Sequence, residues 1–121
     1  MGAIFCLYST QDGEPRFIAG TATSPEAALK QHLTAALENE EQSDLYHWMR
    51  DVLRAGFLVD AYVVQEEVAR DELEMFELYW ARQFPDLLNR LPSEARAKKA
   101  SPAAASISAA IRARIRQEPG S

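Results

Sequence analysis

Three short runs of β-branched and aromatic residues constrain the fold of this chain more than any other feature. Residues 3–9 and 16–20 flank a turn that contains glycine and proline, which predicts a β-hairpin with a longer loop. Residues 57–65 form the third run, with Asp60 and Tyr62 expected on its more exposed side. Three strands are too few for a doubly wound sheet, so we predict a small antiparallel sheet flanked by helices.

Helical periodicity accounts for the segments between and after these runs. Ser24 before Pro25 is a typical N-cap with proline at the first helical position, which predicts a helix over residues 25–38. A second helix, ending at Gly56, follows from apolar residues spaced at i, i+3, i+4, i+7 and i+8. These residues are Leu45, Trp48, Met49, Val52 and Leu53. A third helix is expected over residues 69–83, so the fold class is α+β and the element order ββααβα.

Charge divides the chain into an acidic body and a basic end. Residues 1–90 carry seven basic and sixteen acidic side chains, a net charge of −9, whereas residues 91–121 carry six and two, a net charge of +4. We predict one folded domain over residues 1–90 and a basic tail, rich in Ala, Ser and Pro, over residues 91–121. An acidic body is a poor electrostatic match for nucleic acid, because affinity there comes largely from neutralising phosphates.

The basic tail is the segment that favours DNA as a partner. Ile107, Ile111 and Ile115 recur every four residues and predict an amphipathic helix, but three isoleucines give it a narrow apolar stripe. We expect this helix to be frayed, or ordered only on a partner, rather than packed in the core. The side chains expected to contact DNA are Lys98, Lys99, Arg112, Arg114 and Arg116.

The single cysteine and the N-terminus indicate the cellular compartment. Cys6 lies in the first predicted strand and has no second cysteine to pair with, so we interpret it as a buried packing thiol in a reducing cytoplasm. No basic stretch precedes the first apolar residues, which argues against a secretory signal. No apolar run approaches the ~20 residues needed to cross a bilayer. We expect a cytoplasmic protein with no membrane partner.

Glu77 is the polar residue whose position most needs an explanation. At about 100° per residue, it falls within the apolar stripe that Leu73 and Trp80 mark on the third predicted helix. Burying a carboxylate is costly unless it is paired or bound to a metal. Two interpretations follow: a buried hydrogen bond or salt bridge, for example to His32, or a metal ligand at the sheet surface. His32 lies on the apolar side of its own predicted helix, where a histidine is more often a satisfied core residue than a ligand.

Short motifs in several segments resemble those of the GIY-YIG nucleases, in the same order and over roughly residues 3–90. The segments are Ile4-Phe5-Cys6-Leu7-Tyr8 (GIY), Phe17-Ile18-Ala19-Gly20-Thr21 (YIG), Leu29-Lys30-Gln31-His32 (the arginine-to-histidine stretch), Leu45-Tyr46-His47-Trp48 (the second helix of short bacterial forms), Glu77-Leu78-Tyr79-Trp80 (the glutamate helix) and Leu87-Leu88-Asn89 (the terminal Leu-x-Asn). The resemblance implies a GIY-YIG-like fold.

The resemblance also implies metal-dependent hydrolysis of a phosphodiester bond. In that family a tyrosine helps to activate water, an arginine stabilises the phosphate charge, and the glutamate holds a divalent ion. In this chain the two tyrosine positions are Phe5 and Phe17, and the arginine position is Ala28. The family positions that keep a functional side chain are Glu77, His32 and Asn89.

Two functions stay open from these residues. The leading hypothesis is a catalytically inactive GIY-YIG-like domain, with no cofactor, that binds DNA or a protein and acts in regulation. The alternative is a divergent endonuclease that uses Glu77, His32 and Asn89, with Mg²⁺ or Mn²⁺ at Glu77. Loss of a transition-state cation alone costs orders of magnitude in phosphoryl chemistry, which favours the inactive domain. An unrelated small α+β interaction protein, whose motifs match by chance, is a third interpretation.

Overall fold

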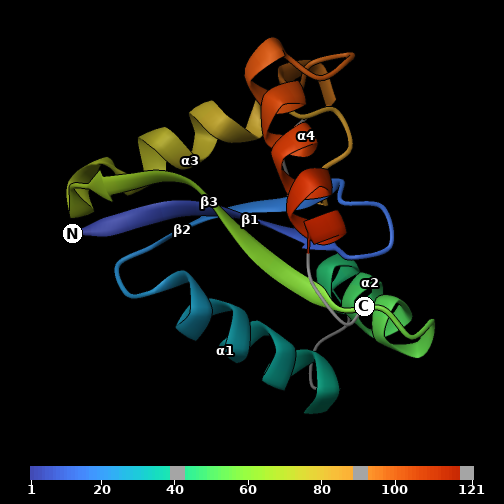
Figure 1. Cartoon of the computed structure of the whole chain (residues 1–121). Helices are drawn as coiled ribbons and strands as arrows, with labels where there is room; N and C mark the ends of the chain where they lie inside the picture. The colour runs from blue at the N-terminus through green and yellow to red at the C-terminus, as the bar shows by residue number, and fades with distance from the viewer. Residues whose placement is uncertain (39–42, 89–92, 118–121) are drawn as a thin grey trace.

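The computed structural model describes residues 1–38, 43–88 and 93–117 and has a three-stranded sheet with helices on both faces (Figure 1). Its elements are β1 (Gly2–Ser9), β2 (Pro15–Thr21), α1 (Pro25–Glu38), α2 (Asp44–Arg54), β3 (Val59–Val68), a 3-10 turn (Arg70–Glu72), α3 (Leu73–Ala81), a second 3-10 turn (Ser93–Ala95) and α4 (Pro102–Gln117). The sheet is antiparallel with strand order β2-β1-β3. The predicted α+β class and the small antiparallel sheet are confirmed.

Local capping interactions set the helix boundaries that the sequence predicted. The Ser24 hydroxyl accepts a hydrogen bond from the Ala27 N–H at 3.1 Å, at the start of α1. Gly56 follows α2 with a φ of 89°, a conformation that glycine adopts without steric cost. The predicted helix over residues 69–83 is shorter in the structure at both ends, because its first turn is a separate 3-10 turn and α3 ends at Ala81. β3 begins two residues later than predicted and runs three residues further.

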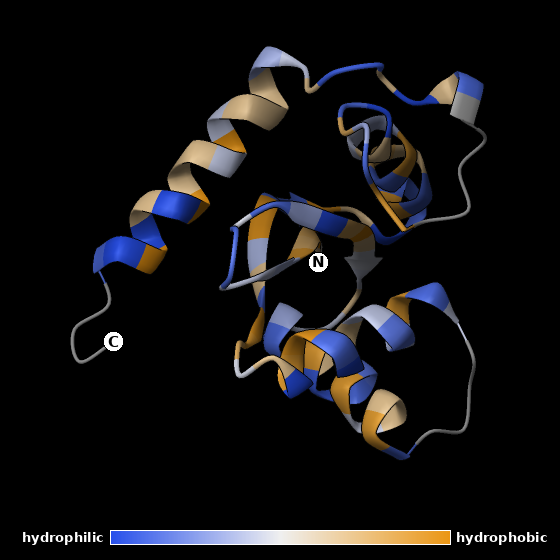
Figure 2. Ribbon diagram, turned by 90° about the vertical axis from the view of Figure 1, so that its right-hand side faces the viewer, coloured by the Kyte–Doolittle hydropathy of each residue, from blue (hydrophilic) through white to orange (hydrophobic). Residues whose placement is uncertain are grey.

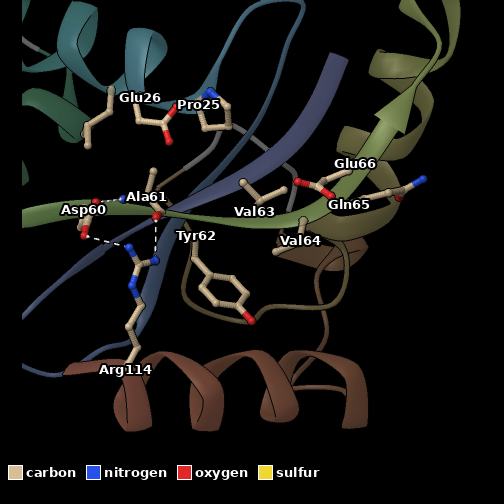
Figure 3. A pocket seen from close by; sticks show the side chains of 11 residues that line it. Pro25, Glu26, Asp60, Ala61, Tyr62, Val63, Val64, Gln65, Glu66 and Arg114 are labelled. Atoms are coloured by element: carbon tan, nitrogen blue, oxygen red, sulfur yellow. Dashed lines mark hydrogen bonds and ion pairs between the residues drawn. The ribbon is translucent and has the colours of Figure 1, made fainter. Parts of the chain in front are cut away.

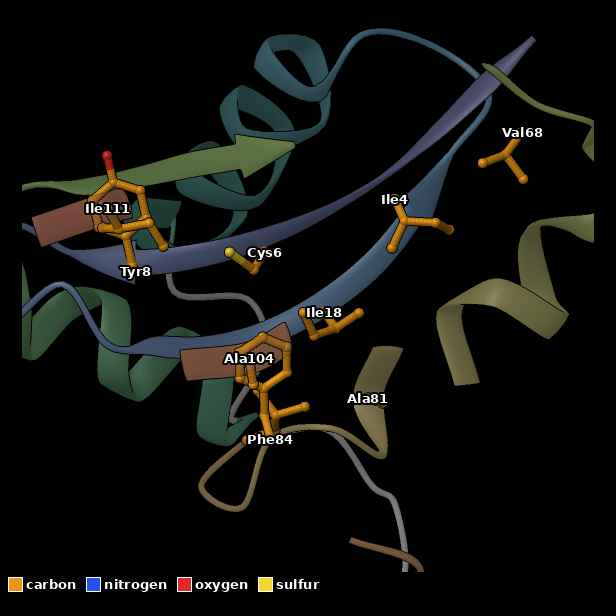
Figure 4. Close-up of a cluster of buried hydrophobic side chains, with 10 residues drawn as sticks. Ile4, Cys6, Tyr8, Ile18, Val68, Ala81, Phe84, Ala104 and Ile111 are labelled. Carbon is orange, nitrogen blue, oxygen red and sulfur yellow. The ribbon is translucent and has the colours of Figure 1, made fainter. Parts of the chain in front are cut away.

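The central strand β1 is buried along its whole length, since helices cover both faces of the sheet. Phe5 and Leu7 point into a cluster beneath α1 and α2. Ile4 and Cys6 point the opposite way, into a cluster beneath α3 and α4 (Figure 4). Figure 2 shows the two helix pairs on opposite sides of the sheet. Because successive side chains of β1 point to opposite faces of the sheet, this one strand contributes to two separate hydrophobic clusters.

Helix α4 packs on the sheet, so the expectation of a frayed or partner-dependent helix is wrong. Ile111 and Ala104 are fully buried, and Ser108 is 6 % exposed. Ile107 and Ile115 are partly buried against the same cluster. The isoleucine stripe is narrow, but small residues at neighbouring positions extend the buried face and allow the helix to lie close to the sheet. The prediction considered only the three isoleucines and so left out the contribution of these small residues.

Docking of α4 also changes the environment of β3 and buries the cysteine. Tyr62 packs partly buried against the cluster under α4, so the expectation that it lies on the more exposed side of the strand is wrong. Asp60 forms an ion pair with Arg114 of that helix, and its side chain remains 39 % exposed. Cys6 is fully buried, and burial raises the pKa of its thiol to about 12. The prediction of a buried packing thiol is confirmed.

No helix in the described ranges is both long and apolar enough to cross a bilayer. The longest of them, α4, has sixteen residues and carries three arginines.

Candidate functional site

The three positions where the resemblance to the GIY-YIG nucleases would place tyrosines and an arginine gather in one hydrophobic cluster. Phe5 is 1 % exposed and Ala28 is 8 % exposed, and both belong to the cluster between the sheet and α1 and α2. Phe17 packs partly buried against the same cluster. Where a GIY-YIG nuclease would carry tyrosines and an arginine, this chain therefore has a closed apolar core.

His32 lies at the rim of that cluster and is engaged by two aromatic neighbours. Its ring meets the ring of Phe17 edge-on, with a centroid distance of 5.6 Å. Its Nδ1 lies 3.4 Å from the hydroxyl oxygen of Tyr46, within hydrogen-bond distance. These contacts agree with the interpretation of His32 as a satisfied core residue.

Helix α3, which carries Glu77, lies on the side of the sheet opposite α1, which carries His32 (Figure 1). The Oε2 of Glu77 accepts a hydrogen bond from the backbone N–H of Gly20 at 3.2 Å. Burial raises the pKa of this carboxyl, the Gly20 hydrogen bond lowers it, and the charge of Glu74 raises it further. Of the two interpretations left open by the sequence, the structure shows a hydrogen bond, with a backbone partner in place of His32.

A metal ion at Glu77 would need ligands other than the His, Cys, Asp and Glu side chains that the structure describes. Within the described ranges, no group of three or more His, Cys, Asp or Glu side chains is arranged to hold a metal ion. Asn89, the third residue that matches the motifs of the resemblance, lies outside the described residues. An Mg²⁺ or Mn²⁺ ion at Glu77 would take its remaining ligands from water or a substrate phosphate.

The basic residues predicted to bind DNA are partly committed to the domain itself. Arg112 forms an ion pair with Glu14, and Arg114 lies 3.8 Å from a carboxylate oxygen of Asp60. Arg116 is exposed and its Nε donates to a backbone carbonyl of the same helix at 3.4 Å. The remaining two basic residues are exposed in the segment before α4: Lys98 and Lys99. The arginines therefore serve in part to hold α4 against an acidic body.

Two surfaces of the structure were missed by the sequence interpretation. The first is a cleft of about 610 Å³ along β3, between α1 and α4 (Figure 3). It depends on the docking of α4, which the sequence did not predict. The second is the outer face of α3, where Met75, Leu78 and Tyr79 are 56 %, 40 % and 51 % exposed at i, i+3 and i+4. The sequence did contain a signal for this surface: these three residues have helical spacing, on a helix that carries apolar residues on two faces.

Replacement of Glu77 by glutamine is expected to stabilise the fold increasingly as the pH rises from about 4 to 7. The folded-state pKa of Glu77 is raised above its ordinary value of 4.5, so its stabilising contribution is complete below that value and is lost as the pH rises through the folded-state pKa. Glutamine keeps an acceptor for the Gly20 N–H and does not ionise. Urea unfolding across this pH range measures the difference between the two proteins.

A charge control accompanies this measurement. Glu66→Gln removes one exposed carboxylate on β3 and reports the general effect of lowering the negative charge. A Glu77→Gln difference that stays constant from pH 4 to 7, or that grows toward acid, would contradict the burial of this carboxyl.

The structure thus places the two candidate polar residues apart and buries the three apolar ones together. Glu77 and His32 lie on opposite sides of the sheet, while Phe5, Phe17 and Ala28 fill a core. Comparison of the chain with known protein families, with curated proteins and with solved structures finds no match.

Proposed function

We propose that this chain is a non-catalytic binding domain with a GIY-YIG-like ancestry, and that its partner is a protein. The observation that carries the proposal is the apolar cluster at Phe5, Phe17 and Ala28. A phenylalanine cannot transfer a proton, and an alanine cannot stabilise a developing phosphate charge. The side chains that the nuclease reaction requires are thus absent from the positions that the resemblance assigns to them.

The placement of the remaining polar residues supports the same proposal. Glu77 is engaged by the backbone of β2, and His32 by Phe17 and Tyr46 on the other side of the sheet. A divergent endonuclease, the alternative function, would have to assemble its chemistry around Glu77 without His32. Catalysis by positioned groups depends on their meeting the same reacting atoms, which these two side chains do not do.

Charge and exposed apolar surface favour a protein over DNA as the partner. Arg112 and Arg114 are paired with carboxylates of the domain, which leaves fewer free cations for phosphates. The outer face of α3 instead presents Met75, Leu78 and Tyr79, residue types that are common at protein interfaces. DNA binding through the exposed cations of the C-terminal region is the competing proposal.

Cleavage and binding assays on DNA test the proposed function. The purified protein and Glu77→Ala are incubated with plasmid and branched DNA in Mg²⁺ and in Mn²⁺, and we expect no cleavage by either. DNA affinity is measured against salt concentration for the parent and for the triple variant Lys98→Gln/Lys99→Gln/Arg116→Gln. We expect both to bind no tighter than non-specific proteins do, with a Kd above about 1 µM near physiological salt.

The outcomes of these assays separate the competing functions. Cleavage by the parent that disappears in Glu77→Ala would establish the divergent endonuclease. Binding that falls steeply with salt and is lost in the triple variant would make DNA the partner. Full resistance of DNA to both proteins, with weak affinity throughout, supports the non-catalytic domain with a protein partner.

A further inference from the structure

We propose that the outer edge of β3 binds a short, extended and basic segment of a partner protein, which joins the sheet as a fourth strand. The inference rests on the proposed function as a protein-binding domain and names the site and the chemistry of the partner. Strand addition of this kind gains affinity from main-chain hydrogen bonds and specificity from the side chains beside the edge.

The two edges of the sheet differ in how their backbone groups are occupied. On β2, the N–H of Gly20 donates to Glu77, and the carbonyl of Arg16 accepts from the N–H of Leu88 at 2.6 Å. Other parts of the chain thus cover the β2 edge at both ends. An unpaired edge presents a row of donors and acceptors to any extended chain, so the remaining edge is the one to consider.

On β3, an ion pair occupies the edge at a single residue. The N–H of Ala61 donates to Asp60 Oδ1 at 2.8 Å, and the Ala61 carbonyl accepts from Arg114 at 3.5 Å (Figure 3). Because backbone groups alternate sides along a strand, those of Val63 lie on the same edge as those of Ala61. Within the described ranges, no hydrogen bond from another element reaches the Val63 backbone on this edge. Asp60 and Arg114 therefore stand where an added strand would make its first pair of hydrogen bonds.

The cleft beside this edge has the dimensions of a short extended peptide. It occupies about 610 Å³ and follows β3 from Asp60 to Glu66, a length of about 20 Å at 3.3 Å per residue. Pro25 and Glu26 of α1 lie on one side of β3 and Arg114 of α4 on the other (Figure 3), and Leu29 of α1 also lines the cleft. An added strand would thus place alternate side chains against α1 and toward α4.

The negative charge around the cleft favours a basic segment as the added strand. Three carboxylates line it, from Glu26, Asp60 and Glu66, against the single cation of Arg114. A second copy of this chain would bring the same carboxylates face to face, and like charges that oppose each other across a strand pair are destabilising. Lysine or arginine at alternate positions of an incoming strand would instead meet opposite charge. The register shift between β1 and β3 beside Ile4 bends the edge and favours a short segment over a long ladder.

A pair of designed peptides tests the site on the full-length protein. The probe is an eight-residue peptide, acetylated and amidated, in which Lys alternates with Thr and Val; its control carries Glu in place of Lys. We expect the Lys peptide to bind at least about 10-fold more tightly at low salt, measured by fluorescence anisotropy. Amide hydrogen exchange at Val63 should slow on binding, whereas exchange at Gly20, on the covered edge, should not change.

Matched variants of α4 give the sharpest discrimination. Arg114→Gln removes the cation that pairs with Asp60 and lies against the Ala61 carbonyl, so we expect it to raise the affinity for the Lys peptide several-fold. Arg116→Gln makes the same change of charge one half-turn further on, outside the cleft, and should have little effect. Glu66→Lys should lower the affinity roughly 10-fold, because it reverses the charge at the end of the cleft.

Each result decides for or against the edge site. Equal affinity of the Lys peptide for Arg114→Gln and Arg116→Gln, with unchanged exchange at Val63, would place the peptide elsewhere; the edge site would then fail while a protein-binding function stands. Failure of the Lys peptide to bind either the parent or Arg114→Gln would overturn the edge site as well. Self-association of Arg114→Gln without peptide binding would also overturn the proposal, because the edge would then accept a second copy of this chain in place of a basic segment. The DNA assays test the underlying function separately.

Discussion

Ile111→Asp is expected to lower the free energy of unfolding by about 4–5 kcal/mol, a large part of the stability of a domain of this size. Ile111 is fully buried between α4 and the sheet, so the substitution removes a packed side chain and places a carboxylate in the cluster that holds Ile4 and Cys6. The midpoint of thermal unfolding should fall by roughly 15–20 °C. Thermal and urea unfolding, followed by circular dichroism, measure the change.

Ala110→Asp is the matched control, since it adds the same charge at the adjacent, exposed position of α4. We expect it to change the free energy of unfolding by less than about 1 kcal/mol. An equal response of the two variants, or an unchanged unfolding midpoint in Ile111→Asp, would show that α4 does not belong to the core. Such a result would favour the hypothesis of a separate basic tail whose unpaired arginines bind a partner.

The elements that the sequence predicted well are those whose signals are local. Ser24 caps α1 through its own hydroxyl, and Gly56 ends α2 through its own backbone conformation. The apolar spacing in α2 repeats within eleven residues. Each of these features is decided by neighbours in sequence, so pattern and propensity were enough to place it.

The docking of α4 was missed because its buried face is made partly of small residues. Ala104 and Ser108 contribute little apolar area of their own, and a search for large hydrophobic residues finds only the isoleucines. Docking of α4 is favoured by the apolar surface that it covers, which is the face of the sheet that carries Ile4 and Cys6. That surface exists only once the sheet has formed, so tertiary contact overrode the local prediction. The cleft along β3 was missed for the same reason.

The sequence predicted part of the environment of the candidate site residues. The position of Glu77 on a helix fixed the side on which its carboxylate lies, and the prediction that it faces the domain agrees with its hydrogen bond. Its partner could not be predicted, because the Gly20 N–H is a backbone group brought near by the packing of α3 on β2. His32 lies on the opposite side of the sheet because the chain crosses from one sheet face to the other between α1 and α3. The spacing of residues in the sequence does not predict that crossing.

Phe5→Tyr, which introduces the tyrosine of the GIY-YIG motif that this segment resembles, is expected to lower the free energy of unfolding by about 2–3 kcal/mol. Phe5 is 1 % exposed within a cluster of apolar side chains, so the added hydroxyl would be buried without a designed partner and would crowd its neighbours. Urea unfolding at neutral pH measures the loss. The same protein should show no cleavage of DNA in Mg²⁺ or Mn²⁺.

Phe17→Tyr provides the comparison, because Phe17 is also a tyrosine position of the family but lies only partly buried at the rim of the cluster. Its new hydroxyl can reach water, and we expect a change of less than about 1 kcal/mol. A nuclease active site must admit water and a phosphate, so a tyrosine at position 5 of a working site would meet solvent at little cost. Equal, small effects of the two substitutions would therefore show that this core opens, and would favour the divergent endonuclease. A large loss confined to Phe5→Tyr would show that packing fills the space that a substrate would need at this position, so that a tyrosine there could not by itself make an active site.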